Sequence, residues 1–252
     1  MMDFNERVIP GVTANFQFQE SLARYEFARV NLEKGIKVLD LGCGTGYGSN
    51  LLSKNFEVFA VDSDKEAISY AKKHYSGSAS FIFADAVFLP FGDDEFDAVC
   101  SFEVLEHIKD DRKMLSEVKR VLKEEGKFIM STPKRVGRKL RSPYHVREYS
   151  YDELSSLLKK YFKRVEIMGQ SKSEKAKSAF DDFLKSQKAR EKMVQGDSFG
   201  IRRLLPKPLK EKIWKLLGAF FGRATQESLK TSDFPITSDI NNAEFFIAIC
   251  QK

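Results

Sequence analysis

Residues 40–46 constrain the fold of this chain more than any other stretch. They read Asp40-Leu41-Gly42-Cys43-Gly44-Thr45-Gly46 and follow an apolar run at 36–41 that is typical of a buried strand. Glycines allow a tight turn and let a ligand approach the main chain, and a helix that starts behind them points its amides at an electron-rich group. A strand, a glycine turn and a helix in this order predict an α/β fold with a ligand site at the turn.

The glycine spacing narrows the class of ligand. The dinucleotide pattern G-x-G-x-x-G requires glycine at position 47, which is Tyr47, and no Lys-Ser/Thr pair follows, so the stretch is not a phosphate-binding P-loop. Asp40 would repel a pyrophosphate, and it suits a cationic ligand instead.

Strands and helices alternate along the rest of the chain. Further strands are predicted at 57–61, 80–84, 96–102, 127–131, 163–168 and 243–250. Helices are predicted from the cap Asp64 to about His74, from the end of the fourth strand to about Lys123, and over 150–160 behind Ser150. The buried side of the second of these is expected to hold Val104, Ile108, Leu115, Val118, Val121 and Leu122. Such alternation predicts a mostly parallel sheet covered on both faces.

Carboxylates follow the second and third strands. Asp62 comes 22 positions after Asp40, where an acid can hold the two hydroxyls of a ribose, and Asp85 follows the third strand, where it can accept from the exocyclic amine of adenine. Together with Asp40 they make three strand-end acids in order, which a plain strand–helix turn does not require. The pattern predicts a site for a cationic nucleoside.

These motifs resemble those of the class I S-adenosylmethionine-dependent methyltransferases, in the branch related to quinone-biosynthesis enzymes. The resemblance covers roughly residues 20–168 and the final strand, and rests on residues 38–48, 61–64, 84–91, 96–107 and 121–126. It implies a Rossmann-like, doubly wound, seven-stranded sheet with an antiparallel last strand, and S-adenosylmethionine as cofactor. The implied cofactor-binding residues are Asp40, Gly42, Cys43, Gly44, Gly46, Asp62, Ser63, Asp85, Ala86 and Phe102. The segment with Arg24 and Tyr25 resembles the helix that closes over the cofactor.

The candidate catalytic residues follow the fourth strand. On a helix, Glu103, Glu106 and His107 would share one face, and His145 could return to the same mouth from behind the fifth strand. Three interpretations stay open. His107 or His145 is a general base for a hydroxyl acceptor; the four residues hold a divalent metal, a pattern similar to that of small-RNA terminal ribose methyltransferases; or His107 caps the helix and the acids are solvated.

The basic charge of the chain is concentrated in one late segment. Residues 171–230 hold 15 basic and 7 acidic residues, whereas the whole chain has a net charge of +6. We therefore expect a methyltransferase domain over 1–170 plus 236–252 and a helical insertion over 171–235. Within the insertion, residues 206–223 are amphipathic, with Trp and Phe beside lysines. They suit a lid over the acceptor, a homodimer contact or a peripheral membrane contact.

Composition and the pattern of apolar residues bear on the cellular location and on the class of function. No apolar run is long enough to span a membrane, the first residues lack a secretory signal, and three separated cysteines suggest reduced thiols, so a cytoplasmic location is expected. The leading hypothesis is an enzyme that O-methylates a small molecule or a sugar- or lipid-linked intermediate. An RNA ribose methyltransferase and a non-catalytic cofactor-binding protein are the alternatives, and the confined basic charge argues against nucleic acid.

Overall fold

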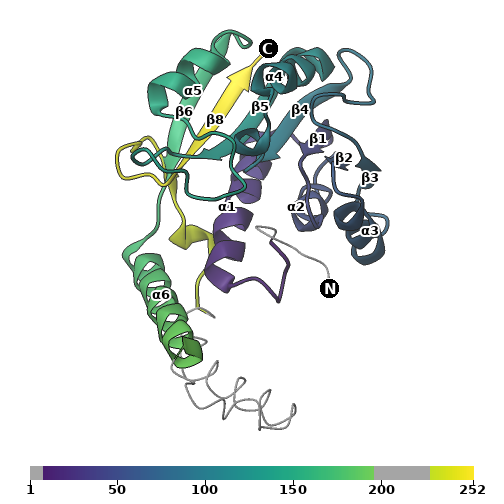
Figure 1. Ribbon diagram of the computed structural model, residues 1–252. Coiled ribbons are helices and arrows are strands. Elements are labelled where there is room, and N and C mark those ends of the chain that lie inside the picture. Colours follow the sequence, from purple (N-terminus) through teal and green to yellow (C-terminus); the bar gives the residue numbers. More distant parts are fainter. Residues whose placement is uncertain (1–7, 196–227) are drawn as a thin grey trace.

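The computed structural model describes residues 8–195 and 228–252 and places their strands in one sheet (Figure 1). The order across the sheet is β3-β2-β1-β4-β5-β8-β6-β7. The strands are β1 (Lys37–Leu41), β2 (Glu57–Asp62), β3 (Ser80–Phe83), β4 (Phe96–Phe102), β5 (Leu122–Pro133), β6 (Arg164–Gln170), β7 (Ile236–Thr237) and β8 (Phe245–Gln251). Strands β1 to β5 pair in parallel, and β8 runs antiparallel to both β5 and β6. The α/β class and the antiparallel last strand are confirmed.

The expectation of seven strands is wrong by one, because the described residues form eight. The extra strand, β7, pairs Thr237 with Gly169 and Ile236 with Gln170 at the edge of the sheet. A strand of two residues is too short to produce an apolar alternation, so the sequence offers no periodic signal for it.

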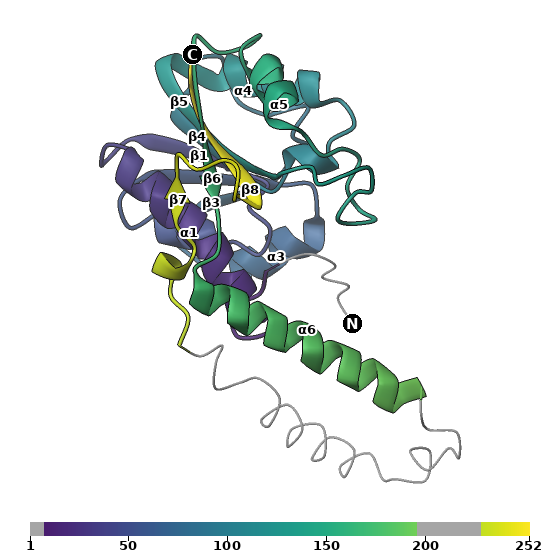
Figure 2. The same ribbon diagram turned by 90° about the vertical axis from the view of Figure 1, so that its left-hand side faces the viewer.

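Helices cover both faces of the sheet and produce two separate apolar cores (Figures 1 and 2). Helices α1 (Asn15–Asn31), α2 (Tyr47–Leu52) and α3 (Lys65–His74) share one core, and α4 (Asp111–Val121) and α5 (Tyr151–Leu158) share the other. Side chains of β5 alternate between them: Phe128 and Met130 join the second core, and Ile129 joins the first. Both predicted caps are confirmed, since Asp64 accepts from the amides that open α3 and Ser150 forms a capping box with Glu153.

The continuous helix predicted behind the fourth strand is wrong. A short 3₁₀ turn, η1 (Leu105–His107), is separated from α4, which begins after Asp110. Glu103 has a left-handed backbone with φ of +57°, and its amide donates to the carbonyl of Ser131, so the chain leaves β4 in a bend. The Asp110 side chain then accepts from the Lys113 amide and starts a new helix. Glu103, Glu106 and His107 therefore do not share a helix face.

Part of the predicted insertion is described. Helix α6 (Glu174–Gln195) projects away from the sheet in both ribbon views, and its first turns touch the body. There Phe180 lies against Phe16 of α1, with ring centroids 5.3 Å apart, beside Leu229 and Phe234 from the returning chain. Residues 206–223 lie outside the described residues, so the division into a domain and an insertion stays a prediction.

Two expectations drawn from composition can be compared with the described residues. No helix there is both long and apolar enough to cross a bilayer. Cys43, Cys100 and Cys250 are buried and unbridged, as predicted for reduced thiols.

Candidate functional site

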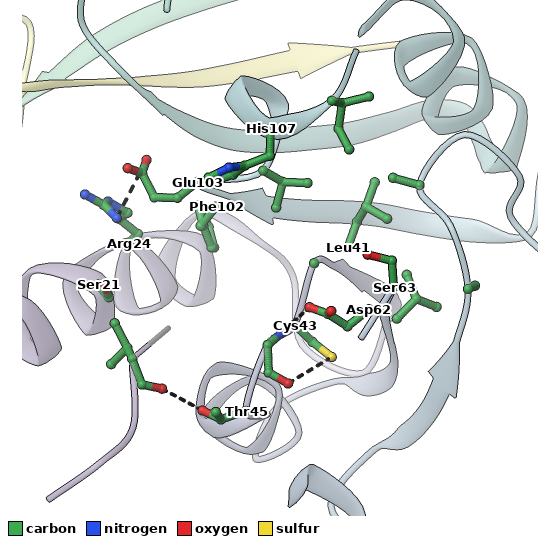
Figure 3. A pocket seen from close by; sticks show the side chains of 18 of the residues that line it. Ser21, Arg24, Leu41, Cys43, Thr45, Asp62, Ser63, Phe102, Glu103 and His107 are labelled. Carbon is green, nitrogen blue, oxygen red and sulfur yellow. Dashed lines mark hydrogen bonds and ion pairs between the residues drawn. The ribbon is translucent and has the colours of Figure 1, made fainter. Parts of the chain in front are cut away.

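A cavity of about 410 Å³ opens at the carboxyl ends of β1, β2 and β4, within the size range of small-molecule sites (Figure 3). Most of the predicted cofactor-binding residues line it, together with residues from α1 and from the turn behind β4. The predicted lining residues are Gly42, Cys43, Gly44, Asp62, Ser63, Asp85, Ala86, Phe102 and His107. Asp40, Gly46 and His145 were also predicted for the site, and the structure places them outside this lining.

Two glycines of the loop serve different purposes. At Gly44, with φ of +52°, a side chain would meet open space, so this glycine leaves room in the cavity. At Gly46, with φ of +85°, an added Cβ would lie 2.7 Å from the Cβ of Ala71 and 2.9 Å from the ring of Phe81. Gly46 is therefore required by packing behind the loop, and Gly44 is the glycine that a ligand would exploit.

Asp62 ties the loop to the end of β2. Its Oδ2 accepts from the amide of Gly44 at 2.8 Å, and its Oδ1 accepts from the amide of Asp64 at 2.9 Å. The carboxylate is thus held in one orientation and is still a lining group of the cavity. Each carboxylate oxygen can accept more than one hydrogen bond, so both retain capacity for ligand hydroxyls.

Asp85 and Ala86 form the neighbouring wall. Asp85 lies two residues beyond the end of β3, and its Oδ1 accepts from the amide of Val87 at 3.1 Å. This short turn brings both residues to the cavity, and their predicted contact with adenine stays a prediction.

Asp40 lies beneath the loop and is fully buried. It accepts from the Ser49 hydroxyl at 2.6 Å and from the Tyr25 hydroxyl at 3.3 Å. Burial raises the pKa of Asp40 to about 7, although both hydrogen bonds act in the opposite direction. Asp40 does not line the cavity, so it can influence a ligand only through its negative charge or by positioning Tyr25. Tyr25, on α1, does line the cavity.

Arg24 and Glu103 form one wall of the cavity (Figure 3). The spacing of the sequence motifs did not predict that these two residues would lie together. Arg24 Nη1 lies 3.7 Å from Glu103 Oε1, and Arg24 Nε donates to Gln170 Oε1 at 2.7 Å. The buried Arg24 Nη2 finds no hydrogen-bond partner within the described part of the chain. An anionic group of a ligand in the cavity would satisfy it. Local motifs indicate Arg24 on a closing helix, but its partner Gln170 comes from a distant part of the chain.

The two candidate catalytic histidines are neighbours. The rings of His107 and His145 stand nearly perpendicular, with centroids 5.0 Å apart. His107 lines the cavity beside Tyr144, whose carbonyl is 3.2 Å from His107 Nδ1. His145 lies behind it, with its Nδ1 2.8 Å from Glu148 Oε1. His145 therefore lies next to His107 but outside the cavity lining, and His107 is the one of the pair that lines the cavity.

Glu106 completes the group from the protein interior. It is fully buried, and its Oε2 accepts from the Thr132 hydroxyl at 3.0 Å. Burial and the nearby Glu103 raise the pKa of Glu106 well above its usual range. Ligand atoms of Glu106, His107 and His145 all lie within 4.8 Å of one another, so these three residues form a potential metal site, and Glu103 is not part of it.

Several lining residues were not predicted from sequence, among them Ser21, Tyr47 and Tyr144. Tyr144 directly precedes His145 in the sequence, and this proximity to a candidate histidine could have indicated that Tyr144 lies at the site. Ser21 had none, because its place depends on how α1 packs against α2.

A parallel sheet with a glycine loop after β1, an acid at the end of β2 and a further acid beyond β3 defines the class of α/β enzymes that bind a nucleoside cofactor at the strand ends. Comparison with known proteins adds a family model for part of the chain. Residues 39–130 match the family model described as a methyltransferase domain. The chain carries a methyltransferase domain over these residues and resembles S-adenosylmethionine-dependent methyltransferases, a family whose cofactor is S-adenosylmethionine.

Individual relatives agree with this assignment. The chain is 38% identical over 127 residues to a probable S-adenosylmethionine-dependent methyltransferase of Mycobacterium tuberculosis, covering 48% of this chain and 46% of the relative. It is 31% identical over 119 residues to the O-methyltransferase cnsE of Penicillium expansum, covering 44% and 43%. The chain thus spans about half the length of these curated relatives.

The likeness in three dimensions extends further along the chain. The crystal structure of an S-adenosylmethionine-dependent methyltransferase from Thermotoga maritima superposes with a TM-score of 0.62 and covers 94% of this chain and 91% of its own. Its identity is 16%, so the likeness concerns the fold.

Proposed function

We propose that this chain transfers the methyl group of S-adenosylmethionine to a hydroxyl group of an acceptor held at the His107 edge of the cavity. One observation carries the proposal: a single cavity joins the glycine loop, Asp62 and Asp85 to His107 and Tyr144. The same cavity therefore offers a cofactor side and an acceptor side. The likeness to a named O-methyltransferase supports oxygen as the atom that receives the methyl group.

The residues present fit the cofactor. The space above Gly44 would be filled by any side chain, and the unpartnered Arg24 Nη2 suits the carboxylate of the methionine part. We assign the ribose hydroxyls to Asp62 and the adenine to Asp85 and Ala86. The ionised form of Asp40 attracts the positive sulfonium through the loop.

When bound, S-adenosylmethionine supplies a methyl group already activated by its sulfonium, so the protein mainly orients and desolvates the reactants. The carbon–sulfur bond breaks as the carbon–oxygen bond forms, and the hydroxyl proton has to leave. His107 is the lining side chain with a ring nitrogen at the acceptor edge, and His145 stands behind it. We assign deprotonation of the acceptor to this pair.

The loop that contributes Tyr144 to the cavity favours an anionic, partly apolar acceptor. Behind β5 the chain carries an exposed loop, 134–147, with six basic and no acidic residues. Apolar side chains on the same loop are also exposed, such as Val136 (64%) and Tyr144 (51%), and Tyr144 reaches the cavity. A sugar- or lipid-linked intermediate combines negative charge with apolar surface, and we propose this class of acceptor.

The same composition recurs in residues 206–223, outside the described residues. A peripheral contact with an anionic membrane through this segment remains our proposal, alongside its use as a lid or a dimer contact. Flotation with vesicles of anionic lipid tests the membrane version, because binding by lysines weakens as salt is added. Failure to float at low salt would remove it.

The decisive experiment is transfer of a radiolabelled methyl group into a cell extract separated into small molecules, lipids, glycans, RNA and protein. We expect label in the glycan or lipid fraction, in a form that resists mild alkali, because methyl ethers are stable where methyl esters hydrolyse. The His74→Ala variant is a matched control, since His74 lies on α3 and stacks on Tyr70, away from the cavity. Label only in RNA or protein would contradict the proposed acceptor class.

A further inference from the structure

Glu106, His107 and His145 converge from two different parts of the chain. Glu106 and His107 belong to η1, and His145 belongs to the loop between β5 and α5. The backbone carbonyl of Glu106 accepts from the amide of Val146 at 2.8 Å and from that of Arg147 at 3.2 Å. These two hydrogen bonds hold the loop against η1, and they place His145 beside His107.

The hydrogen bonds of the two imidazole rings leave the same nitrogen available on each. A carbonyl oxygen only accepts, so Nδ1 of His107 donates to the carbonyl of Tyr144, and Nε2 keeps its lone pair. Nδ1 of His145 faces Glu148 Oε1, which also accepts from the Arg141 amide at 2.6 Å. A carbonyl or carboxylate behind Nδ1 is the arrangement that orients metal-binding histidines.

Glu106 adds an oxygen that lacks a partner. Its side chain is fully buried, its Oε2 is engaged by Thr132, and its Oε1 has no hydrogen-bond partner in the described part of the chain. An unsatisfied buried carboxylate oxygen is costly, and a bound cation would remove that cost.

From this geometry we infer that Glu106, His107 and His145 bind one divalent transition-metal ion, through one carboxylate oxygen and the Nε2 atoms of both rings. Two imidazoles and one carboxylate suit Zn²⁺ or Mn²⁺ better than Mg²⁺ or Ca²⁺, which prefer all-oxygen sites. Neighbouring ligands about 2.1 Å from a tetrahedrally coordinated ion are about 3.4 Å apart. One ligand atom of each residue lies within 4.8 Å of the other two, so the side chains have to move closer together to hold an ion, and the partly exposed His107 ring is free enough to do so.

This site deepens the proposed function, and its catalytic part rests on that function. Because His107 also lines the cavity, an ion held by its ring would lie beside the acceptor side, where an open coordination position could take an acceptor oxygen. An acceptor hydroxyl that binds there in place of water loses its proton to solvent more readily, and the methyl group is then transferred to the resulting alkoxide oxygen. His107 acts in this scheme as a ligand and not as a free base.

Direct titration tests the site without any acceptor. The full chain, stripped by dialysis against a chelator, is titrated with Zn²⁺ and separately with Mn²⁺ in a calorimeter, and Co²⁺ serves as a probe by visible absorption. We expect one ion per chain. His107→Ala and His145→Ala should each weaken binding by more than about 100-fold, and Glu148→Gln by about 10- to 100-fold, because it orients His145 without touching the ion.

His74→Ala is the matched control, because it removes the third histidine of the chain and should leave binding unchanged. Circular dichroism establishes whether each variant is folded. If a histidine variant does not fold, Glu106→Gln takes its place, because it keeps the shape of the side chain and an acceptor for Thr132. No stoichiometric binding by the wild type, or equal binding by the wild type and both folded histidine variants, would overturn the inference.

Failure of this inference is distinguishable from failure of the proposed function. Affinity for S-adenosylhomocysteine and methyl transfer by metal-free protein are measured on the same samples. Transfer that persists without metal refutes the catalytic role of the ion and leaves the proposed function standing, whereas the titration alone decides whether the site binds a metal. Metal binding without any cofactor affinity refutes the proposed function and leaves the metal site standing.

Discussion

The Gly44 amide donates to the Asp62 carboxylate at 2.8 Å, which joins the glycine loop to the end of β2. Two elements that the sequence presents as separate motifs thus form one unit before any ligand arrives. The loop is held in the shape that leaves open space above Gly44. Such preorganisation lowers the entropy cost of binding.

Replacing Asp62 with Ala should therefore weaken cofactor binding in two ways. Hydrogen bonds from ribose hydroxyls to a charged acceptor are lost, each worth on the order of 1.5–3 kcal/mol, and the loop loses its anchor. We expect calorimetry to show affinity reduced by at least about tenfold. Asp93→Ala, which removes an exposed carboxylate far along the chain, is the control. Unchanged affinity in Asp62→Ala would contradict the assignment of the ribose.

Gly44→Val should abolish cofactor binding, because the new side chain enters the open space of the cavity. Valine also strains a left-handed backbone, so a control with the same strain is needed. Gly137 provides it, with φ of +74° and open space around its Cβ in the loop behind β5. Gly137→Val should leave affinity for S-adenosylhomocysteine intact. If both variants bind alike, Gly44 does not adjoin the cofactor.

His107→Ala should lower turnover by about 10²-fold or more and leave cofactor affinity nearly unchanged, since His107 belongs to the acceptor side of the cavity. His145→Ala should do the same. Single-turnover kinetics with and without a chelator distinguish a metal-binding role of the pair from a general-base role. Activity that the chelator removes and Mn²⁺ restores indicates a metal, and activity that the chelator does not change indicates a general base. Full activity in both variants would exclude both roles.

Stability should fall as the pH rises from about 4 to 7, and Asp40 is one cause. Its pKa is about 7 in the folded chain and near 3.8 when unfolded, so the folded form binds more protons across this interval. Each pH unit between these two pKa values removes on the order of 1.4 kcal/mol from the free energy of unfolding. Asp40→Asn should flatten the dependence of the melting temperature on pH over this range. An unaltered slope would show that Asp40 titrates normally.

A shortened variant tests whether the insertion over 171–235 contributes to acceptor methylation. Phe183 and Leu229 belong to one apolar cluster against α1, so residues 184–228 can be replaced by a short glycine–serine linker without removing that cluster. We expect retained affinity for S-adenosylhomocysteine and loss of acceptor methylation. Retained methylation would show that the insertion does not contribute to acceptor recognition, and loss of folding would show that the segment is part of the core.

Features of the site that depend on neighbouring residues could be predicted from sequence. The glycine loop, Asp62 and the Asp64 cap each follow a strand directly, so local spacing sufficed. The strands predicted at 163–168 and 243–250 are both present as β6 and β8, and they pair with each other, with Arg164 opposite Gln251.

Features that depend on the packing of distant segments could not be predicted. Arg24 is fixed by Gln170, and the Glu103 backbone is bent by hydrogen bonds to Ser131. Apolar periodicity runs through residues 104–122 regardless of that bend, so it indicated one helix where two pieces exist. The cap Asp110 was the available signal for the break, but a single cap residue is a weaker signal than a long apolar period.

The position of β8 has a consequence for synthesis on the ribosome. This strand is the last in sequence, yet it lies between β5 and β6 and pairs with both. β6 therefore has no route to the main sheet until β8 has emerged, whereas β1 to β5 can already associate. The exposed edge of β5 has to stay unpaired throughout that interval, which makes it the part of the nascent chain most open to capture by another strand.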